Sequence, residues 1–154
     1  MSDPALREHL VRLLTWQDAH ATFEAATHAV PPALRGAKPA GLPYSPWQLV
    51  EHLRITQADI LAFCRDPDYE EPTWPDDYWP AAETPAEGEW DRAIDAFLAD
   101  REALVELVRT ADLLATVPNG TGQTFLREFL LVADHNAYHI GELVVVRRAL
   151  GNWP

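Results

Sequence analysis

Proline and capping residues mark the ends of four long stretches that are compatible with helix, and this pattern limits the possible folds more than any other feature. The clearest start is Ser45-Pro46-Trp47-Gln48, which combines a capping box with a proline in the first helical turn. Gly151 stands where a C-terminal cap would end the last stretch. The pattern predicts helices over about 4–29, 45–65, 84–117 and 122–150.

Apolar residues recur at helical spacing inside these stretches, without the alternation that is typical of strands. Four helices of this length predict an all-α protein built as an up-down four-helix bundle. The 154 residues fit a single domain over 1–154, with enough mass for a core. Cofactor sites in such bundles form inside, from side chains on facing helices.

The connection between the second and third helices, residues 66–91, differs from the rest of the chain. It holds ten acidic residues, five prolines and no Lys or Arg. Its aromatic residues are Tyr69, Trp74, Tyr78, Trp79 and Trp90. Acidic, proline-rich composition is typical of a solvated, poorly ordered segment. Because exposing so many large aromatic rings to water is costly, we favour the alternative of an ordered flap over the end of the bundle.

The charge balance narrows the possible partners. The chain has 12 Lys and Arg against 24 Asp and Glu, which gives a formal net charge of −12. Such a surface repels polyanions and argues against nucleic-acid binding. No apolar run approaches the roughly 18 residues of a membrane span, and the N-terminus lacks the pattern of a signal peptide. We therefore expect a cytoplasmic protein with no membrane partner.

Histidines supply the candidate metal ligands, because Cys64 is the only cysteine. In the last predicted helix, His135 and His139 lie about 40° apart on one face, and Glu142 shares that face. Two buried imidazoles one turn apart can bind one divalent ion, and the alternative is a pair of core histidines held by hydrogen bonds. A third ligand would come from another helix, and periodicity does not choose between His52 and His20.

Other metal and catalytic patterns are missing from the sequence. No Glu is followed three residues later by His, as a di-iron bundle site requires. Asn136 follows His135 at the position where a zinc-protease helix has Glu. The glycine patterns of phosphate-binding loops and of serine hydrolases are also missing.

Motifs from four parts of the chain match the pattern of a known family. They are Trp16 with His20-x-x-Phe23, the segment 45–53 that contains His52, Tyr78-Trp79-Pro80, and His135-x-x-x-His139-x-Gly141. On these residues the chain resembles the DinB-like family, also described as DinB/YfiT-type metalloenzymes. The resemblance implies a four-helix bundle in which His52, His135 and His139 bind a divalent metal ion. It leaves His20 as a pocket residue near the metal, which is a hypothesis.

The resemblance also implies a chemistry. Three imidazoles leave a coordination position open, as in catalytic rather than structural sites. Relatives in this family include transferases and isomerases that use low-molecular-weight thiols such as bacillithiol, mycothiol or glutathione, and also hydrolases. We therefore expect a metal-dependent transferase that activates a small thiol, or metal-bound water, for attack on a small electrophile. A metal-dependent hydrolase and a non-catalytic metal- or ligand-binding stress protein are the alternatives.

Glu142 is the remaining candidate, since family members commonly carry Gln at its position. We expect it to orient a ligand or to accept a proton, and the alternative is a salt bridge to an arginine of a neighbouring helix. The expected cofactor is a divalent transition metal, namely zinc, nickel, manganese or iron. The expected partners are a small-molecule substrate and, as in many members of the family, a second copy of the chain in a homodimer.

Overall fold

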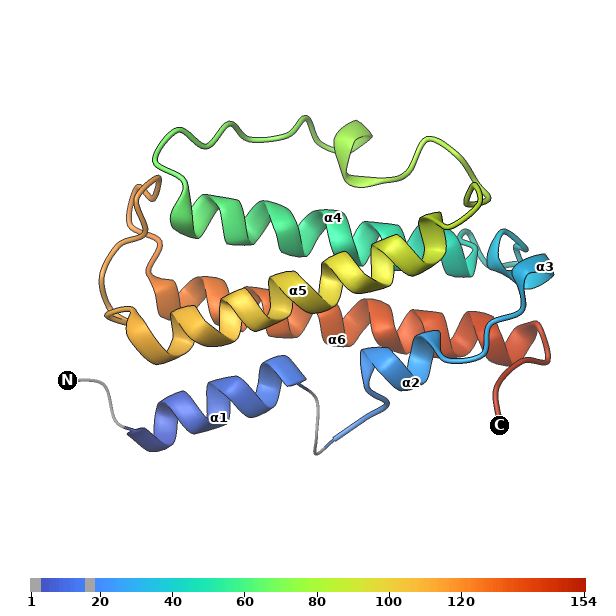
Figure 1. Ribbon diagram of the computed structural model, residues 1–154, viewed down its shortest axis with the longest axis horizontal. Helices are drawn as coiled ribbons and strands as arrows, with labels where there is room; N and C mark the ends of the chain where they lie inside the picture. The colour runs from blue at the N-terminus through green and yellow to red at the C-terminus, as the bar shows by residue number, and fades with distance from the viewer. Residues whose placement is uncertain (1–3, 16–18) are drawn as a thin grey trace.

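The computed structural model describes residues 4–15 and 19–154, and this part of the chain is helical and contains no strand (Figure 1). The elements are α1 (Pro4–Thr15), α2 (Phe23–Thr27), α3 (Pro32–Arg35), α4 (Pro46–Arg65), a 3-10 turn η1 (Asp76–Tyr78), α5 (Glu89–Thr110) and α6 (Phe125–Ala149). The prediction of an all-α fold is confirmed. Trp16 lies outside the described residues.

The four longer helices lie side by side along the long axis of the molecule (Figure 1). α4 packs against α5 and α6, and α1 packs against the same two helices. α4 and α5 run in the same direction, because residues 66–88 return along the length of α4 before α5 begins (Figure 1). A hairpin between antiparallel helices needs only about 2–8 residues. The predicted up-down alternation therefore does not hold for this pair.

The predicted helix over 4–29 is divided into α1 and α2. Thr22 has an extended backbone, and its hydroxyl accepts a hydrogen bond from the Ala25 N–H at 3.1 Å. A capping hydroxyl satisfies an N–H group that lacks a partner at a helix start. This local bond favours a new helix over the continuation of α1, and it leaves His20 exposed in the connection before α2.

The start of α4 is as predicted. The Ser45 hydroxyl accepts from the Gln48 N–H at 3.2 Å, while the Gln48 side chain accepts from the Ser45 N–H at 3.1 Å. These two reciprocal bonds form the capping box. They fix the first turn of the helix that contains His52.

The start of α5 differs from the prediction. The capping pattern at Thr84 is not used, and the helix begins at Glu89 after Gly88. Gly88 has a φ of 74°, a left-handed conformation that glycine adopts at little cost. The Glu89 carboxylate then accepts a hydrogen bond from the Ala86 N–H at 2.7 Å. The acidic side chain that closes this turn is thus Glu89, in place of Glu87 from the predicted capping box.

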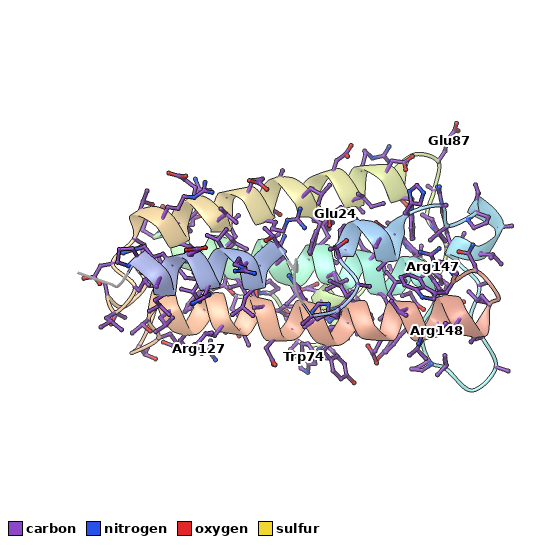
Figure 2. All side chains as sticks on the ribbon, turned by 90° about the horizontal axis from the view of Figure 1, so that it is seen from below. Glu24, Trp74, Glu87, Arg127, Arg147 and Arg148 are labelled. Atoms are coloured by element: carbon purple, nitrogen blue, oxygen red, sulfur yellow. The ribbon has the colours of Figure 1, made fainter. Side chains whose placement is uncertain are left out.

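The acidic connection lies along α4, not over the end of the bundle (Figure 1). The hydroxyl groups of Tyr69 and Tyr78 donate to the Asp59 carboxylate at 2.6 and 2.8 Å. Tyr78 is only 9% exposed, whereas Trp74 is 69% exposed and lies at the outer edge of the molecule (Figure 2). The connection is thus joined to α4 by specific hydrogen bonds from Tyr69 and Tyr78 to Asp59.

The core consists of two apolar clusters. Along α4 the boundary between them falls between Leu53 and Ile60, and along α6 it falls between Ala133 and Ile140. Buried polar side chains lie at or near this boundary: His52, Thr56, Gln57, Asn136 and His139. Because buried polar groups require partners, this polar layer is the natural place to look for a functional site.

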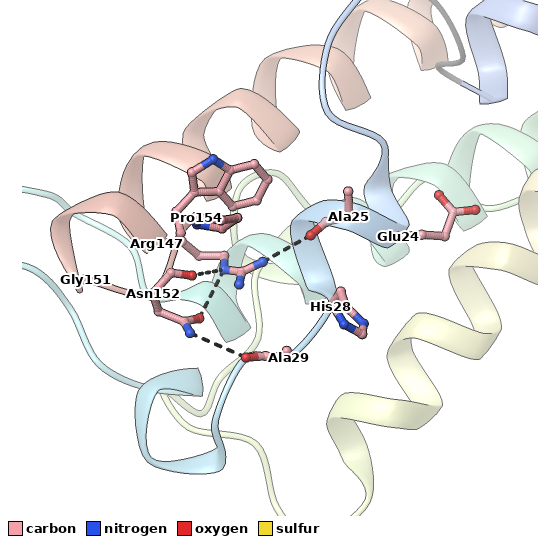
Figure 3. Close-up of a pocket in the computed structure, with 9 residues that line it drawn as sticks. Glu24, Ala25, His28, Ala29, Arg147, Gly151, Asn152 and Pro154 are labelled. Atoms are coloured by element: carbon pink, nitrogen blue, oxygen red, sulfur yellow. Dashed lines mark hydrogen bonds between the residues drawn. The ribbon is translucent and has the colours of Figure 1, made fainter.

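Arg147 joins the end of the chain to α2 (Figure 3). Its Nη1 donates to the carbonyls of Ala25 and Ala26 at 3.1 and 2.9 Å, and its Nε donates to two oxygens of Asn152 at 3.0 and 3.2 Å. Gly151 follows α6 with a φ of 69°, in agreement with the predicted C-terminal cap. Across the described ranges, no helix combines the length and apolar character of a membrane span.

Candidate metal centre

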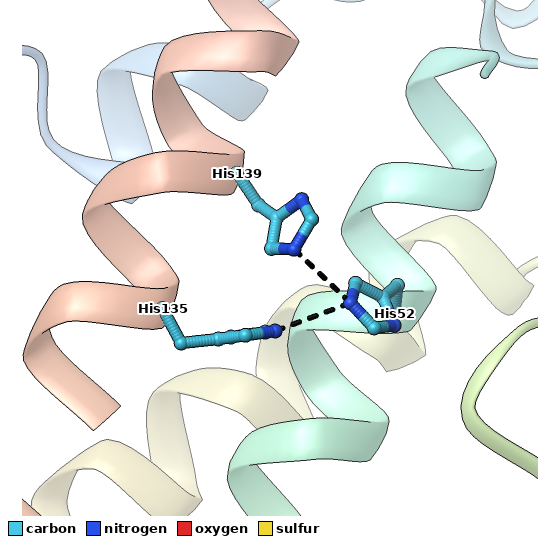
Figure 4. Close-up of side chains that lie close together, drawn as sticks. All are labelled: His52, His135 and His139. Carbon is cyan, nitrogen blue, oxygen red and sulfur yellow. Dashed lines mark hydrogen bonds between the residues drawn. The ribbon is translucent and has the colours of Figure 1, made fainter. Parts of the chain in front are cut away.

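Three imidazoles meet in the polar layer between α4 and α6 (Figure 4). The Nε2 atom of His52 lies 3.1 Å from Nε2 of His135 and 3.2 Å from Nε2 of His139. The nitrogen atoms that the three residues offer all lie within 4.8 Å of one another. The structure therefore brings together the three histidines that the family resemblance implies.

The elements explain why these side chains converge. His135 and His139 are one turn apart on α6 and share a face. His52 projects from α4, whose first turn is fixed by the capping box, and α4 packs directly on α6. His52 is 2% exposed and His139 is 9% exposed, whereas His135 on α6 is only partly buried. The cluster is thus enclosed on the α4 side and reaches solvent on the α6 side.

Hydrogen bonds at Nδ1 determine which nitrogen of His52 and His139 is protonated. His52 Nδ1 lies 2.7 Å from the carbonyl oxygen of Tyr78, and His139 Nδ1 lies 2.7 Å from Glu142 Oε2. A carbonyl or carboxylate oxygen accepts a hydrogen bond, so each Nδ1 must donate one. In the neutral ring this leaves Nε2 with a free lone pair that points at the other imidazoles.

A longer chain of bonds does the same for His135. The Phe97 carbonyl only accepts, so Gln57 must direct its amide nitrogen there, at 2.7 Å. The Gln57 oxygen then accepts from the Asn136 amide at 3.0 Å. This leaves the Asn136 oxygen to accept from His135 Nδ1 at 3.3 Å. This series of hydrogen bonds, from Phe97 on α5 through Gln57 on α4 to Asn136 on α6, therefore gives His135 the same tautomer as the other two histidines.

Burial keeps all three rings neutral. It lowers the pKa of His135 to about 4, and the nearby His139 acts in the same direction. Burial, followed by repulsion from His52, lowers the pKa of His139 to about 4. Burial also lowers the pKa of His52, against the opposing effect of the Tyr78 carbonyl. At neutral pH each ring can therefore act as a ligand without first losing a proton.

The donor set fits a divalent transition metal. Three neutral Nε2 atoms with their Nδ1 protons engaged elsewhere have no proton to share, so their lone pairs repel unless a cation lies between them. Two nitrogens bound to one tetrahedral zinc ion at about 2.0–2.1 Å are about 3.3–3.4 Å apart. The distances of 3.1 and 3.2 Å in the cluster are close to this spacing.

Aromatic rings line the α4 side of the cluster. Trp79 stacks on His52, with ring centroids 3.9 Å apart and an interplanar angle of 2°. Tyr44 stacks in turn on Trp79, with ring centroids 4.2 Å apart. Tyr138 lies edge-on to His139 at 4.9 Å and is 65% exposed. The acidic connection therefore contributes both the carbonyl of Tyr78, which accepts a hydrogen bond from His52 Nδ1, and the ring of Trp79, which covers this imidazole.

The other predicted site residues have different positions. Glu142 accepts a hydrogen bond from His139 Nδ1 at 2.7 Å, and its role in orienting a ligand or accepting a proton stays a prediction. Its pKa is raised by burial. His20 lies exposed before α2 and is not a member of the imidazole cluster, and its role as a pocket residue stays a prediction.

Sequence reasoning missed Gln57 and the Tyr78 carbonyl. A glutamine inside a helix and a backbone oxygen in a loop have no distinctive pattern of their own. The only available signal was that Gln57 lies five residues after His52 and shares a helical face with the apolar residues Leu53, Ile60 and Leu61.

The comparison with protein families agrees with this geometry. The family model of the DinB superfamily matches residues 15–143, a range that contains the three imidazoles, all of α4 and α6 as far as residue 143. No curated protein and no solved structure matches the sequence. Because the family model covers most of a chain whose fold is all-helical, the chain belongs to the DinB superfamily.

Proposed function

We propose that His52, His135 and His139 hold a divalent transition-metal ion and that the protein is an enzyme that transfers a small thiol to a small electrophile. The observation that carries the proposal is the convergence of three Nε2 atoms whose rings each have Nδ1 bonded to an oxygen acceptor. Imidazole ligands suit zinc, nickel and iron. An oxygen that accepts a hydrogen bond from the Nδ1–H of a ligating histidine orients the ring and raises the basicity of its Nε2 atom.

A bound divalent ion would offer an open coordination position and lower the pKa of a thiol or water there. The residues of the chain hold this arrangement in place. Trp79 covers His52 and keeps water from that face, while Glu142 fixes the ring plane of His139. The partly exposed α6 side, next to Tyr138, is the side from which a substrate can approach.

Thiol transfer makes few further demands on the site. The thiol sulfur forms a bond to carbon of the electrophile, the leaving group departs with its electron pair, and the thiol proton passes to solvent. Glu142 has one carboxylate oxygen engaged with His139, so it is better suited to hold this ring than to activate water. This division of roles favours a nucleophile that is already anionic near neutral pH.

The direct test uses protein that was purified without a His-tag and loaded with Zn²⁺, Ni²⁺ or Mn²⁺. Each form is mixed with small thiols and 1-chloro-2,4-dinitrobenzene, and thioether and chloride are measured. We expect metal-dependent product with the wild type and none with His52→Ala, while Glu106→Gln on the far surface of α5 behaves as the wild type. Metal bound in stoichiometric amount with no product for any thiol would contradict the transferase and favour a binding protein without turnover.

A hydrolase is the second candidate, and the raised pKa of Glu142 is the observation that favours it. A carboxyl group with a pKa closer to neutral is a better general base. The loaded protein is therefore also assayed with p-nitrophenyl acetate in the absence of thiol. Turnover that is lost in Glu142→Gln would replace transfer by hydrolysis as the function.

A further inference from the structure

A cavity lies between the end of α2 and the end of α6, apart from the imidazole cluster (Figure 3). Its volume is about 770 Å³, in the range of small-molecule sites. Its walls include Ala25, His28 and Ala29 from α2 and the turn after it, and Arg147 and Trp153 from the end of the chain. None of the three imidazoles lines it.

Arg147 is the unusual group in this cavity. It is only 3% exposed, and each hydrogen-bond partner that it has is a neutral oxygen, from a backbone carbonyl or from the Asn152 amide. Trp153 covers one face of the guanidinium, 5.0 Å from the ring centroid. Among the described residues, no carboxylate pairs with this buried cation.

Glu24 is the one acidic side chain among the residues that line the cavity, and its carboxylate is engaged elsewhere. Glu24 forms a two-pronged ion pair with Arg101 on α5. Burying a charge without a counter-charge is costly, and partial charges on carbonyls offset only part of that cost. In agreement, burial lowers the pKa of Arg147 with no charged group acting against it.

One nitrogen of Arg147 remains available. Nε and Nη1 donate to Asn152, Ala25 and Ala26, and all of these bonds except that to Ala26 are drawn in Figure 3. Nη2 has no hydrogen bond to any residue that the structure describes. Within the same residues, Arg101 Nε is the one fully enclosed side-chain polar atom without a partner. Nη2 of Arg147 is therefore in contact with solvent. Because the rest of the residue is buried, solvent reaches this atom through the cavity that Arg147 lines.

We propose that this cavity is a second ligand site, which binds a small carboxylate attached to an aromatic body. Nη2 of Arg147 would donate to the carboxylate and supply the missing opposite charge. Trp153 and the methyl groups of Ala25 and Ala29 would contact the ring. The proposal goes beyond the metal site and does not depend on it.

The test follows binding by NMR on the full chain, with phenylacetate as the probe. Its matched probes are 2-phenylethanol, which lacks the charge, and acetate, which lacks the ring. We expect phenylacetate to shift the amides of Gly151 and Asn152 and the indole N–H of Trp153, and to bind at least about tenfold more tightly than either matched probe. Equal affinity for phenylacetate and 2-phenylethanol, or shifts confined to other residues, would overturn the proposal.

Two variants separate the site from the fold. Arg147→Lys keeps the charge but removes the planar fork, and we expect at least a tenfold loss of affinity, with the exposed neighbour changed in Arg148→Lys as control. Because Arg147 also ties α2 to the end of the chain, Ala25→Trp provides an independent test. It adds bulk at an exposed helical position that lines the cavity, and it should abolish binding while the circular dichroism stays unchanged. Wild-type affinity in either variant would rule the site out.

Discussion

The position of one proton on each imidazole decides what the cluster can bind. Tyr78, Asn136 and Glu142 each present an oxygen to an Nδ1 atom, so the lone pairs of all three rings are directed inward at Nε2. These three acceptors differ in kind, being a carbonyl, an amide and a carboxylate. The same tautomer is thus imposed in three ways, which indicates that the inward lone pairs are what the site requires.

Gln57 offers the sharpest test of this view at the residue scale, because its hydrogen bonds go to Phe97 and Asn136 and not to an imidazole. Gln57→Leu removes the bond that fixes the Asn136 amide, so His135 loses its defined tautomer. We expect the affinity for Zn²⁺ or Co²⁺ to fall about 10- to 100-fold, measured by competition with a chromophoric chelator. Thr27→Val, which removes a buried hydroxyl that is bonded to Phe23 within α2, should leave metal affinity unchanged. Equal affinities for Gln57→Leu and the wild type would mean that the chain of amides is merely structural.

Glu142 permits a comparison between a carboxylate and an amide at one position. Glu142→Gln keeps an oxygen that can accept from His139 Nδ1, whereas Glu142→Ala leaves that N–H without an acceptor. We expect Gln to retain metal affinity within a few-fold and Ala to lose about tenfold or more. Titration calorimetry with Zn²⁺ measures both. Equal losses in the two variants would show that the charge, and not the orientation of His139, is what matters.

Residue-scale prediction from sequence was possible where helical spacing carried the information. His135 and His139 are four residues apart, so their shared face follows from the helix itself. His52 and His20 are each on a separate segment, and only the family resemblance chose between them. The structure explains why periodicity failed there, since the cap at Thr22 interrupts the helix in which His20 was expected.

At the scale of elements, two tyrosines hold the 66–88 connection on α4. Both hydroxyls donate to Asp59, and the Tyr78 backbone also reaches His52. Burial, together with these bonds to Asp59, raises the pKa of Tyr78 to about 12. The connection is therefore a fixed wall of the imidazole cluster, in contrast to what its acidic, proline-rich composition alone suggests.

Tyr78→Phe tests this attachment. The variant loses a buried hydrogen bond to a charged group, so we expect the free energy of unfolding to fall by about 1–2 kcal/mol. Limited proteolysis should also cut within 66–88 more rapidly. Trp74→Leu, in the same segment but 69% exposed, serves as the control and should change neither measurement. An unchanged cleavage rate in Tyr78→Phe would show that other contacts hold the connection.

The Glu24–Arg101 ion pair joins α2 to α5 and predicts a pH dependence. Arg101 holds the pKa of Glu24 below its usual value of 4.5. A carboxyl whose pKa is lower in the folded state contributes stability above its unfolded pKa and loses it as the pH falls through the folded pKa. Glu24→Gln should therefore melt below the wild type at pH 7, and the gap should close as the pH falls below 4.5 and through the lowered pKa of the folded state. Glu87→Gln, at an exposed position at the upper edge of the view in Figure 2, serves as the control and should melt like the wild type.

For the whole molecule, local sequence patterns predicted the helical fold and some helix ends, but not the directions of the helices. The cap at Ser45 and the glycine at 151 mark ends that the structure reproduces. The direction of α5 depends instead on how far residues 66–88 travel, which is decided by contacts with Asp59 and Trp47 that are distant in sequence. Such long-range contacts leave no periodic trace in the sequence, so the parallel arrangement of α4 and α5 could not be read from it.

This arrangement makes the metal site a link between distant parts of the chain. An ion held by His52 and by the pair on α6 would join α4 to α6 across the boundary between the two apolar clusters. Binding to the folded state alone stabilises a protein by about 4 kcal/mol when the free ion is at 1,000 times its dissociation constant. For a chain of this length, that corresponds to a rise in melting temperature of about 8–16 °C. We expect this rise on adding Zn²⁺ to chelator-treated protein, and none in the His135→Ala/His139→Ala variant. An unchanged melting temperature of the wild type on adding Zn²⁺ would mean that water, and not a metal ion, satisfies the lone pairs of the cluster. That result would contradict the proposed metal-dependent chemistry.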